Sequence, residues 1–311
     1  MGPTTDSSIG ANIQGPSLVR VPDWVEDPLG RYYLYFADHK GSYIRLAHAD
    51  ELTGPWKVHR PGSLHLAESH FLTEPPPATD EEIELVRQAY LDVLGSTELA
   101  HSLTVDATTP HIASPDVHID HDHRRFVMYF HGLEALGSQV SRAALSDDGI
   151  HFTARSEILG LPYLRAFRHR DQVYALAMPG HFSRSADGLS GFEPGPVLFE
   201  KHMRHSALAV RGELLHVFWS RVGDAPERIL CSTIDISGDW MSWAEGPAFE
   251  VLRPELPWEG ADAPVEPSVR SVAHGHVNQL RDPAIFEEGD RTYLLYAVAG
   301  ESGIALAALD L

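Results

Sequence analysis

Carboxylate and imidazole side chains recur in this sequence at the beginning of short apolar segments, and these residue types perform general acid–base catalysis. Asp116 follows Ser-Pro, Asp282 lies between Arg and Pro, and His205 follows Met-Arg. Such chemistry needs one group that donates a proton and one ionised group that activates water. A histidine, with an ordinary pKa of about 6.5, holds a proton at neutral pH when a nearby carboxylate raises that pKa. We therefore take Asp116, Asp282 and His205 as candidate catalytic residues.

Basic and aromatic residues near the same segments are candidate substrate-binding residues. Arginines such as Arg165 and Arg281 hold hydroxyls or carboxylates through their several N–H donors, and Trp219 offers a flat face on which a ligand ring can stack. The competing interpretations are structural: Asp282 caps a turn before proline, His205 is a hydrogen-bonded rim residue, and Trp219 packs inside the fold. The predicted binding set is Arg165, Arg281, His39, His131, His181, Arg221 and Trp219.

The elements that position these residues form an internal repeat. Each copy has a short apolar strand, a turn with Gly or Asp, and an aromatic-rich strand such as YYLYFA or RTYLLY. Alternating polarity bounded by turn residues indicates strands, and four antiparallel strands in each repeat make a propeller blade. We therefore predict an all-β fold, a five-bladed β-propeller formed by residues 1–311 as a single domain. The matched repeat positions are Gly15, Ser114, Leu164, His205 and Asp282.

Too few residues follow Asp282 for a complete last blade, so we expect the segment before Gly15 to cover its open edge. A helical insertion, residues 63–110, separates the first and second blades. Thr79 and Glu82 form a capping-box pattern, and Gly95 ends the predicted helix. Ile83, Val86, Tyr90 and Leu94 lie along one helical face. The insertion is either a prop against the side of the propeller or a lid over the site.

The propeller fold predicts where the polar residues meet. The inner strand of each blade begins at the same face where the loop between its second and third strands emerges, so residues at these places converge around the central axis. Inner-strand starts supply Gln14, Ser17, His111, Ser114, Asp116, Arg165, Arg204, His205, Gln279, Arg281 and Asp282, and the loops supply Asp38, His39, Lys40, His131, Glu134, His181, Arg221, Asp224 and Glu301.

Two segments resemble a known enzyme group. The segment 114–117, SPDV, is followed by RRFVMYF, and the segment 281–283, RDP, is followed by RTYLLY. This pattern is similar to the five-bladed β-propeller glycoside hydrolases of family 43 and relatives such as families 117 and 130. The resemblance implies a funnel that holds an Asp base, an Asp that tunes pKa, and a Glu acid. It implies the pKa-tuning role for Asp116 and a base or stabilising role for Asp282.

The sequence also departs from that pattern. Gly15-Pro16-Ser17 stands where family 43 places its basic Asp, and residues 163–165 stand where its acidic Glu lies. Because one branch resembling family 117 uses a histidine as acid, the resemblance implies that role for His205. We therefore expect a glycoside hydrolase, inverting and exo-acting, on a short oligosaccharide or small glycoside. Inversion places the acid and base about 6.5–9.5 Å apart.

Three other functions remain open. A phosphorylase would use a basic cluster, for which the candidates are Lys40, Arg165, Arg204, Arg221 and Arg281. A metal-assisted lyase, isomerase or hydrolase would use imidazole ligands. A non-catalytic glycan-binding propeller would need similar pockets in several blades, whereas the blade starts differ from repeat to repeat. The histidines available as metal ligands are His111, His118, His131, His181, His205 and His276.

Composition limits the partners. The chain of 311 residues carries 24 Lys and Arg against 44 Asp and Glu, a formal net charge of −20, which disfavours nucleic acid and anionic membranes. We expect a small carbohydrate partner and a cytoplasmic location, since no leader or membrane-spanning run is evident, with a secreted mature form as the alternative. The propeller sides or the insertion offer a surface for a homodimer, but no apolar stripe requires one. We expect no required cofactor. The resemblance implies room for a structural calcium or other divalent cation in the central channel, with His276 as the candidate ligand.

Overall fold

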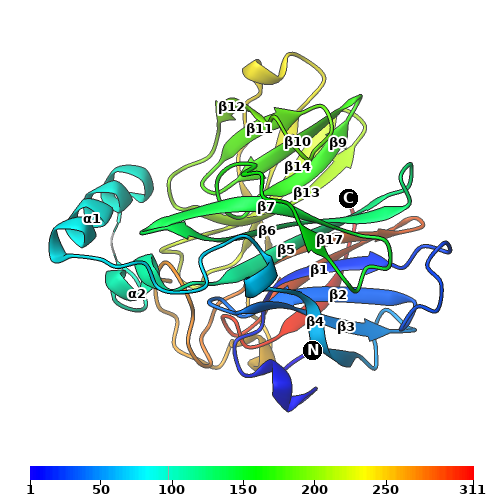
Figure 1. Cartoon of the computed structure of the whole chain (residues 1–311), viewed down its shortest axis with the longest axis horizontal. Helices are drawn as coiled ribbons and strands as arrows, with labels where there is room; N and C mark the ends of the chain where they lie inside the picture. Colours follow the sequence, from blue (N-terminus) through cyan, green and yellow to red (C-terminus); the bar gives the residue numbers. More distant parts are fainter. Residues whose placement is uncertain (97) are drawn as a thin grey trace.

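Five antiparallel sheets surround a central axis in the computed structural model, which describes residues 1–96 and 98–311 (Figure 1). Four sheets have four strands and the last has three. The first two blades contain β1 (Gln14–Arg20), β2 (Tyr32–Ala37), β3 (Tyr43–Ala49), β4 (Lys57–His65), β5 (Ile112–Asp120), β6 (Arg125–Ala135), β7 (Ser138–Ser146) and β8 (Thr153–Ala154). The predicted all-β five-bladed propeller is confirmed.

The remaining blades follow in chain order. They contain β9 (Arg165–His169), β10 (Gln172–Ala177), β11 (His181–Ser185), β12 (Glu193–Val197), β13 (Met203–Arg211), β14 (Leu214–Arg221), β15 (Ile229–Asp235), β16 (Phe249–Leu252), β17 (Arg281–Glu288), β18 (Arg291–Ala297) and β19 (Ile304–Leu309). The α-helices are α1 (Asp80–Leu94) and α2 (Leu103–Thr108), and the 3-10 helices are Ser7–Ile9, Leu66–Glu68, Trp240–Ser242 and Pro257–Glu259.

The alternation in β2 shows how neighbouring blades pack. Tyr33 and Tyr35 join the apolar cluster shared with the second blade, whereas Leu34 and Phe36 join the cluster shared with the last blade. All four side chains are buried. Because successive side chains of a strand point to opposite faces, an aromatic strand inside a blade fills the space on both sides. The aromatic repeats therefore form the core between blades.

A left-handed residue marks the start of every inner strand. The φ angles are 61°, 52°, 59°, 37° and 47° at Gly15, Ser114, Tyr163, His205 and Asp282 respectively. Such backbone is strained for residues with a side chain, and it concentrates at functional sites. The structure corrects the repeat alignment in the third blade by one residue, because the equivalent position is Tyr163 rather than Leu164. This shift brings an aromatic side chain to the matched position.

The N-terminal segment covers the edge of the last blade, as the sequence predicts. The amide of Ile13 donates to the carbonyl of Glu301 at 2.6 Å, and the amide of Ile304 donates to the carbonyl of Met1 at 2.8 Å. Ile9 and Ile13 pack in one apolar cluster with Phe286 of β17. The segment closes the ring through these contacts without forming a regular fourth strand in that sheet.

The insertion runs between the end of β4 at His65 and the start of β5 at Ile112. In α1 the capping box predicted from Thr79 and Glu82 is present, and Gly95 ends the helix with a φ of 72°. Figure 1 shows α1 standing to one side of the sheets. None of the described residues of α1 is buried, and Leu85 is 72% exposed. The helix is therefore attached to the propeller by few contacts.

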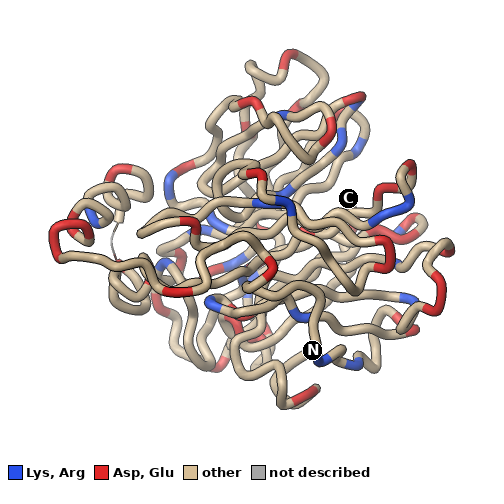
Figure 2. Tube along the Cα trace, viewed as in Figure 1, with Lys and Arg blue, Asp and Glu red and all other residues tan. Residues whose placement is uncertain are grey.

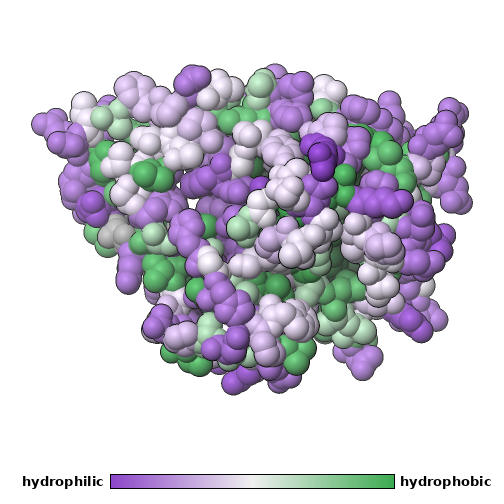
Figure 3. All heavy atoms as spheres, turned by 90° about the horizontal axis from the view of Figure 1, so that it is seen from below, coloured by the Kyte–Doolittle hydropathy of each residue, from purple (hydrophilic) through white to green (hydrophobic). Residues whose placement is uncertain are grey.

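The surface carries its acidic residues on many sides. Figure 2 shows Asp and Glu distributed over loops and α1 around the molecule, rather than gathered on one face. In the view of Figure 3, hydrophobic residues lie in separated groups among hydrophilic ones. In the described part of the chain, neither α-helix has the length and hydrophobicity that crossing a bilayer requires.

Candidate functional site

A cavity of about 520 Å³ lies between α1 and one face of the propeller. One wall is apolar and the floor is polar. The helix α1 thus forms part of the cavity wall, the place that the lid interpretation of the insertion requires. The apolar wall contains Leu85, Val86, Ala89, Val93, Leu94, Leu136, Leu161, Pro162, Met178 and Pro179, and the polar lining contains His39, Tyr90, Asp106, Tyr163, Arg204, His205, Arg270 and Ser271.

Helix α1 bridges two blades across this cavity. Val86 packs against Gly137 in the turn between β6 and β7, where an added Cβ would lie 2.7 Å from Val86 Cγ1. Near the other end of the helix, Lys201 Nζ donates to the carbonyl of Asp92 at 2.6 Å. Lys201 lies in the turn that leads into β13, so the helix reaches from the second blade to the start of the fourth.

His205 and Asp282 form a buried pair at the floor. His205 Nδ1 lies 3.0 Å from Asp282 Oδ1, and both side chains are almost fully buried. Neither carboxylate oxygen of Asp282 makes a hydrogen bond with any described residue, since the approach to His205 is out of hydrogen-bonding alignment. Burial, followed by the charge of Glu301, raises the pKa of Asp282 to about 7. Burial and the neighbouring Arg204 hold the pKa of His205 well below its ordinary value. The carboxyl group therefore holds the shared proton.

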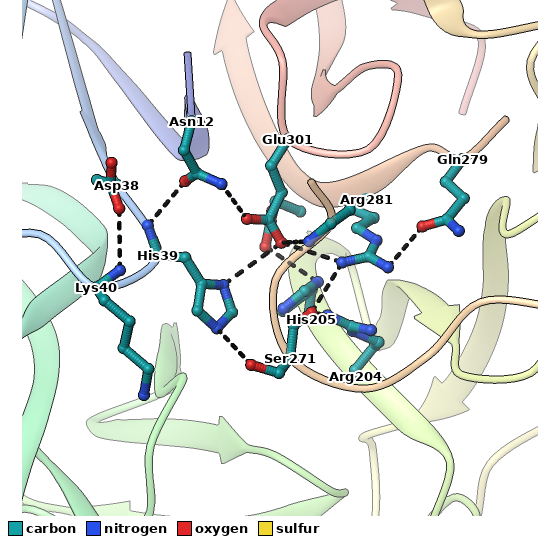
Figure 4. Close-up of polar contacts among 12 residues, drawn as sticks. Asn12, Asp38, His39, Lys40, Arg204, His205, Ser271, Gln279, Arg281 and Glu301 are labelled. Atoms are coloured by element: carbon teal, nitrogen blue, oxygen red, sulfur yellow. Dashed lines mark hydrogen bonds and ion pairs between the residues drawn. The ribbon is translucent and has the colours of Figure 1, made fainter. Parts of the chain in front are cut away.

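The pKa of Glu301 is shifted in the opposite direction to that of Asp282. Its Oε1 lies 3.4 Å from His39 Nδ1 and 3.0 Å from Arg281 Nη1, and its Oε2 accepts from Asn12 Nδ2 at 2.7 Å (Figure 4). Burial opposes ionisation, but the contacts with His39 and Arg281 outweigh it and lower the pKa of Glu301 to about 2. Glu301 is ionised beside a protonated Asp282, which is the arrangement expected when two nearby carboxyl groups have unlike environments.

Two buried arginines fix the backbone beneath the cavity. Arg281 Nη1 and Arg204 Nη2 donate to the carbonyl of Ser271 at 2.9 and 3.0 Å. Arg281 Nε also lies 3.1 Å from Glu227 Oε2. Because its donors are taken by Glu227, Glu301, Gln279 and backbone carbonyls, Arg281 is a support of the site. The predicted role of Arg281 as a substrate clamp is not supported by this placement.

Asp106 enters the site from α2 of the insertion. Its Oδ2 accepts from the hydroxyl of Tyr90 at 2.8 Å, and its Oδ1 lies 2.9 Å from His101 Nε2 and 3.4 Å from Lys40 Nζ. Burial raises the pKa of Asp106, but the hydrogen bond from His101 and the charge of Lys40 hold that pKa far below its ordinary range. Sequence reasoning missed this residue because the short segment around it has no repeat or motif that points inward.

Tyr163 lies between these acidic groups. Its ring centroid is 4.2 Å from that of His131 and 5.0 Å from that of His205. Burial and then the charge of Asp282, with smaller effects of Glu301 and Asp106, raise the pKa of its hydroxyl above the ordinary value. The hydroxyl stays protonated and can donate a hydrogen bond at the cavity floor.

Comparisons with known proteins agree with the fold. No family model matches the sequence. The uncharacterized protein R118 of Acanthamoeba polyphaga mimivirus is 35% identical over an alignment that covers 98% of this chain and 85% of the viral protein. The chain belongs to the family of R118. Its sequence relationship is therefore clear, although that relative carries no described activity.

Solved structures of family-43 enzymes share the propeller of this R118 family member. A thermostable family-43 glycoside hydrolase is 12% identical, with a TM-score of 0.56 over 96% of this chain and 90% of that one. A GH43 β-xylosidase/α-arabinofuranosidase from a compost microbial metagenome, solved with xylotriose, is 11% identical, with a TM-score of 0.58 over 97% and 92%. A GH43_1 enzyme from Xanthomonas citri is 11% identical, with a TM-score of 0.58 over 97% of this chain and 89% of that one. The resemblance predicted from the sequence is thus confirmed for the fold.

Most carboxylates near the cavity of this R118 family member do not lie at the left-handed starts of the inner strands. The left-handed positions of the first three blades hold Gly15, Ser114 and Tyr163, none of which is a carboxylate. Only the last blade has an acidic residue, Asp282, at that position. The other carboxylates near the cavity, Glu301 and Asp106, come from a blade loop and from the insertion.

The structure does not bring Asp116 to the cavity, which corrects its predicted pairing with Asp282. Its Oδ2 accepts from the amide of Ala166 at 2.9 Å and lies 2.8 Å from His118 Nε2. Ser114, with its left-handed backbone, takes the position at the strand start, and Asp116 lies further along β5. Asp116 therefore ties the second blade to the third.

Arg165 and Trp219 are also structural in this placement. Arg165 is buried and donates to the carbonyls of Ser206 and Ser114, each at 3.0 Å, so it links three blades. Trp219 is buried in the fourth blade, where its Nε1 donates to Ser232 Oγ at 3.3 Å. Neither side chain lines the cavity. Their predicted substrate contacts are thus replaced by packing.

The predicted histidines separate into two groups. His39 and His205 line the cavity, and His131 lies behind Tyr163 with its pKa held well below the ordinary value by burial and then by His111. His181, at the start of β11, lies outside the cavity lining, and so does the predicted binding residue Arg221, which pairs with Glu200 at 2.6 Å.

His276 does not reach the central channel. Its Nε2 lies 2.6 Å from Asp262 Oδ1, and the side chains of both residues are about half exposed. Within residues 1–96 and 98–311, no group of three or more His, Cys, Asp or Glu side chains is arranged to hold a metal ion. The residues present do not fit the implied calcium, and no step below uses a metal.

Proposed function

We propose that this protein is a glycoside hydrolase that acts on a small glycoside in the cavity beside α1. One observation carries the proposal: two carboxyl groups, one lining the cavity floor and one directly behind His205, have pKa values displaced in opposite directions. Asp282, with its pKa raised to about 7, keeps its proton in weakly acidic solution and loses it as the pH passes neutrality, whereas Asp106 stays ionised. Pairs of titratable groups separated in this way provide the acid and the base of a hydrolase. The family-43 propeller fold supports this chemistry.

In the proposed reaction His205 delivers the proton. Its ring lines the cavity, and Asp282 lies 3.0 Å behind its Nδ1. Rotation of the ring into alignment lets Asp282 protonate Nδ1 while the opposite nitrogen donates its proton to the leaving oxygen. Asp106 takes a proton from water, which attacks the anomeric carbon as the glycosidic bond breaks. One water is consumed, the sugar is released with inverted configuration, and the protons return to their original sites.

The cavity shape supports a small substrate. Its volume of about 520 Å³ lies within the range of roughly 300–1,000 Å³ that small-molecule sites occupy. The insertion closes one side of the funnel, so the ends of a long polysaccharide would meet α1. The polar floor suits the sugar, and the apolar wall suits an aryl or alkyl aglycone. We therefore infer exo-action on short or apolar-substituted glycosides.

The test is a screen of 4-nitrophenyl glycosides and short oligosaccharides with the wild type and Asp282→Asn. We expect turnover by the wild type and a loss of roughly 100-fold or more in Asp282→Asn, since general acid–base groups contribute about 10²–10⁴-fold. The matched control is Asp262→Asn at the exposed pair with His276, which we expect to retain full rate. Full turnover by a folded Asp282→Asn variant would overturn the proposal.

The same screen separates the alternatives. Product release that requires inorganic phosphate and yields a sugar phosphate would favour the phosphorylase. Loss of turnover after chelation, restored by a divalent metal, would favour metal-assisted chemistry. Saturable glycan binding without turnover would favour the non-catalytic propeller.

A further inference from the structure

A second series of reactive groups, two of which line the same cavity, is not used in the mechanism above. Ser271 Oγ is 3.4 Å from His39 Nε2, and His39 Nδ1 is 3.4 Å from Glu301 Oε1 (Figure 4). A hydroxyl, an imidazole and a carboxylate in this order are the nucleophile, base and orienting group of acyl-transfer enzymes. The three residues come from different parts of the chain: the loop before β17, the loop after β2 and the loop before β19.

The backbone of Ser271 is held in a strained conformation. Its φ is 74°, in the left-handed region, and its carbonyl accepts from Arg281 Nη1 at 2.9 Å and from Arg204 Nη2 at 3.0 Å. Non-glycine residues persist in this region only where their surroundings fix them, and such positions cluster at active sites. Ser271 lines the cavity, so its hydroxyl can meet a ligand.

His39 is oriented for the role of base. Glu301 is almost fully buried and is ionised, with a pKa of about 2. An ionised carboxylate beside Nδ1 favours the tautomer with the proton on that nitrogen, which leaves the lone pair of Nε2 facing Ser271. The amide of His39 also donates to Asn12 Oδ1 at 2.8 Å, and Asn12 contacts Glu301, so the loop and the carboxylate are held together.

Arg270 supplies unused donors next to Ser271. The residue is 6% exposed and lines the cavity. Its Nη2 donates to the carbonyl of Lys201 at 3.0 Å, while Nε and Nη1 have no hydrogen-bond partner among the described residues. A buried, unpartnered guanidinium group is costly unless a ligand satisfies it. Beside a nucleophilic serine, it would bind the oxygen on which negative charge develops.

Ser271 has competing contacts in this structure. Its Oγ lies 3.3 Å from both Asp106 Oδ1 and His101 Nε2. Because one position of Oγ makes all three contacts, the hydroxyl hydrogen selects among these partners and His39 by turning about the Cβ–Oγ bond. The neighbouring Lys40 and His101 offset the charge of Asp106, which would otherwise oppose an oxyanion nearby.

We propose that Ser271, His39 and Glu301 catalyse hydrolysis of carboxylic esters whose apolar acyl chain lies along the α1 wall. Ser271 Oγ attacks the ester carbonyl as its proton passes to His39 Nε2. The carbon–oxygen bond to the alcohol breaks, and the alcohol leaves with that proton. Water then attacks the acyl-enzyme, its proton passes through His39 to Ser271 Oγ, and the free acid is released. The activity goes beyond the proposed glycoside hydrolysis and uses a different nucleophile.

The test combines covalent labelling with ester turnover in the intact chain. We expect a fluorophosphonate to add one label, placed on Ser271 by peptide mass spectrometry, and 4-nitrophenyl octanoate to be hydrolysed. Ser271→Ala and Ser271→Gly should lose both signals, and His39→Gln should slow labelling by roughly 100-fold or more, as expected for loss of a general base. Two serine variants are used because glycine relieves the left-handed strain that alanine keeps.

Ser302→Ala is the matched control, since Ser302 lies outside the cavity lining and contacts only backbone carbonyls through its hydroxyl. It should keep label and turnover. Absence of label from Ser271 in the folded wild type, or ester turnover retained in both Ser271 variants, would overturn the proposal. Labelling is measured without any glycoside, so its result is independent of the outcome of the glycosidase screen.

Discussion

The floor of the cavity lies within the propeller, where each charged group is packed against another, whereas the α1 wall stands outside it and is largely exposed. Arg281, directly beneath the floor, is 1% exposed and contacts two glutamates, but Leu85 on the wall is 72% exposed. Groups buried in a fixed arrangement cannot relax when one is removed, while an exposed apolar helix can shift at small cost. The floor is therefore suited to holding shifted pKa values, and the wall is suited to adapting its shape to a ligand.

We expect the largest loss of stability when the buried ion pair beneath the floor is removed. Glu227 lies 3.1 Å from Arg281 Nε and 3.8 Å from Arg204 Nε, and it is fully buried. Glu227→Gln should lower the unfolding free energy by about 3–5 kcal/mol, because it leaves buried guanidinium charge without its partner. Denaturant unfolding measures this. Glu84→Gln, which breaks an exposed pair with Arg87 on α1, should change it by less than about 1 kcal/mol. Equal losses in both variants would contradict the contrast between floor and wall.

The pH dependence of stability should reveal the buried carboxyl group. The pKa of Asp282 rises from 3.8 to about 7 in the folded protein. The folded state then binds this proton more tightly than the unfolded chain, so its contribution to stability is present below the unfolded pKa and is lost as the pH rises through the folded one. The Asp282→Asn variant lacks this pH-dependent contribution. The unfolding free energy of the wild type should therefore fall, relative to that of the variant, between pH 4 and pH 8. Glycoside turnover should fall above a pH of about 7.

Glu301 does not produce the same signal. Its pKa falls from 4.5 to about 2 in the folded protein, so its contribution to stability is present above the unfolded pKa and is lost only as the pH falls toward 2. A difference in stability between wild type and Asp282→Asn that stays constant with pH would show that Asp282 titrates normally. Unfolding curves at several pH values make this comparison.

A smaller effect is expected on the wall. Val86 lines the cavity, whereas Leu91 lies on α1 outside the lining. Val86→Ala should raise KM for substrates with an apolar group several-fold, because about 1–2 kcal/mol of apolar contact is lost, with little change in melting temperature. Leu91→Ala should leave KM unchanged. A matching KM increase in both variants would mean that α1 acts only as a support.

We expect the smallest effect from two glycine substitutions that distinguish side-chain contact with α1 from backbone strain alone. Gly137 and Gly212 have φ angles of 66° and 59°, but only at Gly137 would an added Cβ meet Val86. Both alanine variants should lose about 1 kcal/mol of stability through their left-handed backbone. Gly137→Ala should in addition change KM by displacing Val86. If Gly212→Ala changes KM equally, the contact between α1 and the turn is not what shapes the wall.

The features that depend on local physics could be predicted from the sequence. Alternating aromatic strands predicted five blades, the pattern at Thr79 and Glu82 predicted the start of α1, and blade position alone placed His39, His205, Asp282 and Glu301 near one axis. These predictions succeed because strand alternation and helix capping depend on neighbouring residues. The uneven spacing of the third repeat hid the match at Tyr163.

Which polar residues share the cavity depends on packing between distant segments of the chain. Asp106 and Ser271 lie in connections without periodicity, so only the packing of the insertion against the loop before β17 brings them within 3.3 Å. Packing likewise directed Asp116 and Arg165 between blades, where backbone amides and carbonyls needed partners. The type of a residue limits the chemistry that it can perform. Its pKa, and therefore its protonation state, depends on burial and on neighbouring charges. Both come from contacts between distant parts of the chain.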